Sequence, residues 1–110
     1  MRAYLIDEIS PSDMKKVSGF LREVAISSSL DDLFWVKLPH DFLNGEQFEH
    51  RHCKPHVFAV ELGFNFVKLE LFVRSLKGMR CTCPGYCTEK QLLHVFDFAH
   101  GMLDQLGIRT

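Results

Sequence analysis

Short stretches in which apolar and polar positions alternate predict strands along the chain. Four of them are expected at residues 4–6, 33–38, 57–62 and 66–75. A fifth, shorter strand is expected at 79–83, where Pro84 and Gly85 end it. The short interval at 63–65 favours a hairpin, so the neighbouring strands should pair in antiparallel fashion.

Two longer stretches have helical spacing instead. Ser10 as cap and Pro11 at the first helical position predict a helix over 11–26. Its inner stripe is Met14, Val17, Leu21, Val24 and Ala25. A second helix begins after Thr88, which forms a capping-box pattern with Gln91, and ends at Gly107. Its inner stripe is Leu92, Phe96, Ala99, Leu103 and Leu106, widened by Val95 and Met102, with His94 on the polar side.

The element order β-α-β-β-β-β-α predicts an α+β fold. We expect a two-layer sandwich with one mainly antiparallel sheet of about five strands and two helices on one face. A chain of 110 residues is the size of a single domain, so residues 1–110 are expected to form one. Residues 39–55 form a long connection with one helical turn around 46–49, and such loops are often functional.

Composition excludes several classes of protein. The chain is 46% hydrophobic with a formal net charge of -1, which is typical of a globular protein and not of a disordered one. Six basic residues against two acidic ones at 51–80 are too few to predict a nucleic-acid interface. Asp7 and Glu8 interrupt any signal-peptide pattern, and no apolar run is long enough to span a membrane. A cytoplasmic protein is therefore expected.

The alternation also predicts which sheet face each side chain occupies. The inward set is Phe34, Val36, Leu38, Phe58, Val60, Leu62, Val67, Leu69, Leu71 and Val73. Trp35, Val57 and Phe72 fall on the opposite face, among charged residues. Large apolar residues on an open face predict a partner surface, for another protein or a second copy of the chain. Alternatively, a strand slip or the long connection folding over this face would bury them within the domain.

Three of the four cysteines form a C-x-C-x3-C cluster at Cys81, Cys83 and Cys87. In a reducing compartment these residues are thiols or metal ligands rather than disulfides. Residues two apart in a strand point the same way, and the Pro-Gly bend can bring Cys87 beside them. The cluster therefore predicts a structural or regulatory zinc site that needs a fourth ligand.

Candidates for that ligand crowd the end of the long connection: His50, His52, Cys53 and His56. Cys53 would complete a site of four thiolates, and failing that His52 or His56 would supply one imidazole. The string CTCPGYC before a helix is similar to the first part of a SWIM-type zinc finger. Glu89 stands where that pattern has its histidine, and only three residues separate the second and third cysteines.

Two other interpretations of the cysteines remain open. The segment from Cys83 to Cys87 is similar to the glutaredoxin CPYC string with one residue inserted, and this resemblance implies thiol redox chemistry using Cys83 and Cys87. The cysteines could also be small apolar residues at a strand end. The sequence contains no Ser-His-Asp order, phosphate loop or dinucleotide fingerprint, so a binding domain is favoured over an enzyme.

Overall fold

The structure is a computed structural model that describes residues 1–77 and 81–110. Within them, the sheet strands are β1 (Ala3–Ile6), β2 (Ile26–Ser27), β3 (Leu33–Lys37), β4 (His56–Leu62), β5 (Val67–Glu70), β6 (Phe72–Ser75) and β7 (Gly85–Tyr86). The α-helices are α1 (Pro11–Val24), α2 (Gly45–Glu49) and α3 (Glu89–Leu106). Two short 3-10 turns, η1 (His40–Phe42) and η2 (Arg51–Cys53), flank α2.

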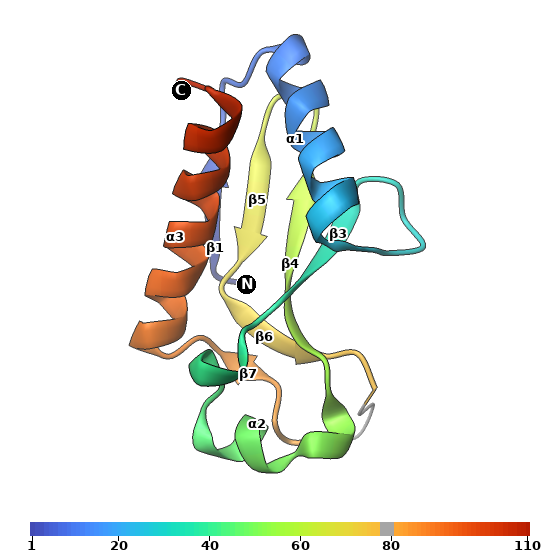
Figure 1. Ribbon diagram of the computed structural model, residues 1–110, viewed down its shortest axis with the longest axis vertical. Helices are drawn as coiled ribbons and strands as arrows, with labels where there is room; N and C mark the ends of the chain where they lie inside the picture. The colour runs from blue at the N-terminus through green and yellow to red at the C-terminus, as the bar shows by residue number, and fades with distance from the viewer. Residues whose placement is uncertain (78–80) are drawn as a thin grey trace.

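The strands form one antiparallel sheet in the order β1-β5-β4-β3-β2, and β6 pairs with both β4 and β7. Helices α1 and α3 lie over one face of this sheet, whereas α2 lies beyond its lower end (Figure 1). The structure thus confirms the predicted α+β sandwich with a mainly antiparallel sheet. The predicted hairpin is present, because Val60 of β4 pairs with Leu69 of β5 and the chain turns between Gly63 and Phe66.

The helix caps follow from the sequence. The Ser10 side chain accepts a hydrogen bond from the Asp13 amide, and α1 begins at Pro11. This helix ends at Val24, which is 54% exposed and does not belong to the inner stripe predicted for it. It stops two residues early because Ile26 instead pairs with Trp35 at the edge of the sheet.

The last helix has both predicted ends. Thr88 and Gln91 form the predicted capping box of α3, and Gly107 adopts the left-handed conformation at its C-terminal cap. His94, predicted on the polar side, is half-buried. Its ring lies 4.3 Å from the Phe42 ring and 6.4 Å from the Phe58 ring, because η1 packs against this side of α3.

The core lies between the helices and the inward sheet face. Phe34, Phe58 and Val60 are at most 2% exposed, as the alternation predicts. The residues of α1 and α3 that pack most deeply against them are Val17, Leu21, Val95, Ala99 and Met102. Burial of this apolar surface is the main favourable term in folding, and it fixes the sheet on which the candidate site is built.

The stretch predicted as one strand at 66–75 is divided into β5 and β6. Leu71 separates them, because its amide donates to the Arg2 carbonyl at 3.0 Å and its carbonyl accepts from the Cys87 amide at 3.1 Å. Of the strand predicted at 79–83, residues 79 and 80 lie outside the described residues. Residues 81–83 are irregular, and pairing resumes only at β7, the predicted bend.

Candidate metal centre

Two segments that are distant in sequence meet at the lower end of the sheet. One is the connection that carries α2 and η2, and the other is the irregular segment at 81–83 that leads to β7 (Figure 1). They bring together one ligand atom each from His50, Cys53, Cys81 and Cys83, all within 4.8 Å of one another. One nitrogen and three sulfur atoms therefore face a shared point.

The connection is ordered by its own hydrogen bonds. The expected helical turn is α2, which begins at Gly45 and is capped by Asn44 through a complete capping box with Gln47. The following turn η2 carries Cys53, whose amide donates to the His50 carbonyl at 3.0 Å. In a 3-10 turn, residues three apart lie on the same side. This local geometry places His50 and Cys53 together.

Two contacts then fix the connection against the second segment. The Thr82 hydroxyl donates to the Glu46 carboxylate at 2.7 Å, at the surface. The Gln47 side-chain amide donates to the Cys83 carbonyl at 3.2 Å, in the interior. Because both contacts join α2 to residues 82 and 83, the two halves of the cluster are held together by groups other than the cluster itself.

The distances within the cluster are short. His50 Nδ1 lies 2.7 Å from Cys81 Sγ, and Cys81 Sγ lies 3.0 Å from Cys83 Sγ. A tetrahedral zinc ion with Zn–S bonds of about 2.3 Å would hold two sulfur atoms about 3.8 Å apart. Small side-chain rotations would therefore open the cluster to this size. Cys53 and Cys83 are at most 3% exposed, whereas His50 and Cys81 are half-buried.

The three thiols differ in acidity. Hydrogen bonds from Cys53 and Cys83 lower the pKa of Cys81 to about 6. Burial raises the pKa of Cys83 to about 12, and the hydrogen bond to Cys81 raises the pKa of Cys53. The hydrogen bond to Cys81 also raises the pKa of His50. Cys81 is thus the first of the three thiols to lose its proton as the pH rises. A cation that binds the cluster would displace the protons of the other two thiols.

The sequence placed three of these residues in the candidate zinc site, namely Cys53, Cys81 and Cys83. The fourth ligand atom comes from His50, which is one of the four candidates at the end of the long connection but not one of those expected to complete the site. The spacing His50-x2-Cys53 was the available signal, because a single turn brings such a pair to one side. The predicted alternative His52 is exposed, and its ring stacks on the His50 ring at 5.8 Å.

Cys87 is not a member of this cluster. Pairing of β7 with β6 carries it away along the sheet, and its side chain packs against the hydrophobic core. Burial raises the pKa of Cys87 to about 11. A thiol redox pair needs a lowered pKa in at least one member, and both Cys83 and Cys87 have raised values, which disfavours the redox interpretation of this pair.

His56 lies behind the cluster instead of within it. Its Nε2 is 3.4 Å from Cys83 Sγ, and the side chain is 2% exposed. Burial, followed by the charges of Lys54 and His50, lowers the pKa of His56. As a neutral imidazole it can donate Nε2–H to the Cys83 sulfur, a contact of the kind that orients metal ligands. Its Nδ1 has no hydrogen-bond partner in the described part of the chain.

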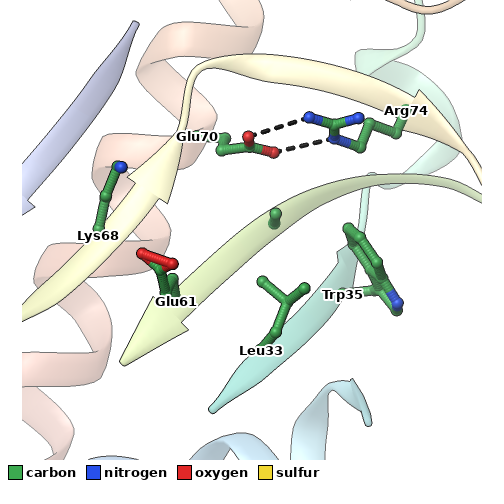
Figure 2. Close-up of a pocket in the computed structure, with 7 residues that line it drawn as sticks. Leu33, Trp35, Glu61, Lys68, Glu70 and Arg74 are labelled. Carbon is green, nitrogen blue, oxygen red and sulfur yellow. Dashed lines mark hydrogen bonds and ion pairs between the residues drawn. The ribbon is translucent and has the colours of Figure 1, made fainter. Parts of the chain in front are cut away.

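The sheet face opposite α1 and α3 has a groove of about 200 Å³ (Figure 2). It is lined by Leu33, Trp35, Ala59, Glu61, Lys68, Glu70 and Arg74. Glu70 and Arg74 form a two-pronged ion pair at 2.9 and 3.0 Å across one end. The Trp35 side chain forms part of the wall on the β3 side.

The predicted partner surface is therefore only partly open. Trp35 and Phe72 are half-buried, and the Phe72 ring packs edge-on against Tyr86 at 5.2 Å. Val57 is fully buried and contributes nothing to this face. It lies in the central strand β4, between Lys37 of β3 and Arg74 of β6.

Comparisons with known proteins add no family to this geometry: no family model, no curated protein and no solved structure matches the chain. Among the described residues, none of the helices combines the length and the apolar character that crossing a bilayer requires. The chemistry of the His50, Cys53, Cys81 and Cys83 cluster is thus the basis for a functional interpretation.

Proposed function

We propose that the protein is a small zinc-binding domain in which His50, Cys53, Cys81 and Cys83 hold one structural zinc ion. The single observation that supports this is the convergence of one imidazole nitrogen and three sulfur atoms within 4.8 Å. Three cysteines and one histidine form a common ligand set of structural zinc sites. Magnesium, calcium and manganese prefer oxygen ligands, so this ligand set favours zinc.

The number of ligands supports a structural role over a catalytic one. Four protein ligands complete a tetrahedral site, whereas a catalytic zinc keeps one position for water or substrate. The ion would join the connection at 50–53 to the segment at 81–83. Because an unfolded chain does not hold these residues together, the binding free energy adds to the stability of the fold. Three reduced thiols in one site also favour a cytoplasmic location.

Metal analysis of protein purified without a histidine tag tests the proposal directly. Native mass spectrometry should show one zinc ion per chain, and a strong chelator should remove that mass. The melting temperature should fall on removal of the metal and recover when zinc is added back. Protein that takes up no zinc under reducing conditions would contradict the proposal.

Matched variants test the choice of ligands. Cys81→Ser and His50→Ala should each lose zinc at a chelator concentration that the wild type withstands. Cys87→Ser and His52→Ala change the same residue types a few positions away and should retain zinc, because neither residue belongs to the cluster. Equal loss in the variants and their controls would show that the ligand set is wrong.

A second function, self-association through the uncovered sheet face, is supported by the groove beside Trp35. Acidic and basic side chains alternate on this face, at Glu61, Lys68, Glu70 and Arg74. Two copies related by a two-fold axis can oppose unlike charges there. Light scattering over a concentration series tests it: the wild type should form a dimer that Trp35→Glu disrupts. A monomer at every concentration would exclude this function.

A further inference from the structure

A second pocket, of about 240 Å³, lies where the end of β3, the turn η1 and the residues before β4 come together. We call it the cationic pocket, and it is lined by Lys37, Leu38, His40, Leu43, Lys54, Pro55 and His56. Two lysines and two histidines from three segments thus border one small space. No carboxylate is among the described residues that line it.

The two lysines of the cationic pocket are unpaired within the part of the chain that the structure describes. Neither Lys37 nor Lys54 forms an ion pair or side-chain hydrogen bond with the described residues. Lys54 is half-buried and Lys37 is exposed. Two ammonium groups at one pocket, without a carboxylate among its described lining, attract an anion. The arrangement is therefore complementary to a negatively charged group.

Each histidine adds a polar group to the same wall. The His40 ring is held edge-on against the Phe48 ring at 4.6 Å. His56 is buried, and its Nδ1 has no hydrogen-bond partner among the described residues. A buried polar atom without a partner is uncommon in folded proteins. Because His56 donates through Nε2, its Nδ1 can only accept a hydrogen bond, so the anionic group of a ligand pairs with the lysines and not with His56.

The remaining wall of the cationic pocket is apolar, formed by Leu38, Leu43 and Pro55. Its volume is below the range of about 300–1,000 Å³ that is usual for drug-sized ligands. A ligand that fills it must be small and must combine a charged end with a short apolar body. We propose that the cationic pocket binds a small organic anion, whose carboxylate or phosphate group pairs with Lys37 and Lys54 while its apolar part contacts Leu43 and Pro55.

This inference does not rest on the zinc ion, although Lys54 follows Cys53 directly. The probes are benzoate and phenyl phosphate, with benzyl alcohol as a neutral probe of similar size. In low salt, one or both anions should bind to the full chain and shift the amide signals of residues 37, 38, 40–43, 54 and 56 in nuclear magnetic resonance spectra. The two anions separate a carboxylate ligand from a phosphate ligand. Equal binding of benzyl alcohol, or no binding of either anion, would overturn the proposal.

Variants locate the binding. Lys54→Gln should lower the affinity for the anion by about tenfold, which corresponds to about 1.4 kcal/mol. Lys54→Arg should retain most of the affinity. Lys15→Gln removes the same charge from the exposed surface of α1 and serves as the matched control. An unchanged affinity in Lys54→Gln would contradict the site. Zinc content is measured on every sample. Wild-type protein that holds zinc but binds neither anion refutes this inference alone, and wild-type protein that binds an anion but takes up no zinc refutes only the zinc site.

Discussion

Gln91 Nε2 donates a hydrogen bond to Gln47 Oε1 at 2.9 Å, and both side chains are fully buried. Each glutamine is also the third residue of a capping box, in α3 and in α2 respectively. Gln47 in turn donates to the Cys83 carbonyl at 3.2 Å. A continuous chain of amides therefore leads from the N-terminus of the last helix to the candidate metal centre.

Replacement of Gln47 by Met should destabilise the protein by about 2–3 kcal/mol, because the change preserves volume but leaves buried partners without hydrogen bonds. Zinc affinity should fall as well, since the Cys83 segment loses its contact with α2. Urea unfolding and a zinc competition assay measure the two effects. Gln105→Met, at an exposed position of α3, is the control and should change stability by less than about 0.5 kcal/mol. Equal effects of the two changes would contradict a special role for Gln47.

Stability should depend on the free zinc concentration. Above the dissociation constant, each tenfold increase in free zinc should add about 1.4 kcal/mol to the free energy of unfolding, as linkage requires for a ligand that binds only the folded chain. Thermal unfolding in zinc buffers gives this slope. In Cys81→Ser the free energy of unfolding should not depend on the free zinc concentration. A wild-type slope near zero would mean that zinc does not bind preferentially to the folded state.

Cys87 should react slowly with thiol reagents in the folded protein. Burial raises the pKa of Cys87 to about 11, so at pH 8 the group is almost entirely the unreactive thiol. Mass mapping after a short exposure to iodoacetamide should find Cys87 unmodified in buffer and modified in urea. Rapid labelling in buffer, at the rate of an unfolded cysteine, would show that the side chain is not packed against the core.

His94 should contribute to loss of stability in acid. Burial of His94 against Phe42 and Phe58 lowers its pKa below the usual 6.5, so the folded state resists protonation while the unfolded state accepts a proton. The free energy of unfolding should therefore decrease as the pH falls below about 6.5. His94→Gln, compared with the wild type at fixed free zinc, should flatten this decrease. Parallel pH profiles of the two proteins would exclude this contribution.

The parts of the fold that were predictable depend on local rules. Alternation placed Phe34 and Phe58 in the core, and the capping residues Ser10 and Thr88 marked where two helices begin. The break at Leu71 could not be predicted, because its cause is pairing with Arg2 and Cys87, which are distant in sequence. The burial of His94 likewise depends on η1, which packs against α3 only in the folded molecule.

The candidate metal centre was predictable to a similar extent. The C-x-C pair and Cys53 have the residue types that zinc requires, and these three residues converge. The choice between His50 and Cys87 depends on tertiary structure. Pairing of β7 directs Cys87 to the core, while the turn η2 directs His50 toward Cys81. Neither event leaves a signal in the periodicity of the sequence.

A metal ion held by Cys53 and Cys81 would act as a cross-link within the chain. Cys53 and Cys81 lie on either side of β4, β5 and β6, so an ion bound between them closes a loop of about 28 residues. A cross-link of that length restricts the unfolded chain by about 3–4 kcal/mol in a simple entropy model. After proteolytic cleavage at the exposed Lys77, the metal would join the two fragments in addition to the core contacts of α3 with the sheet.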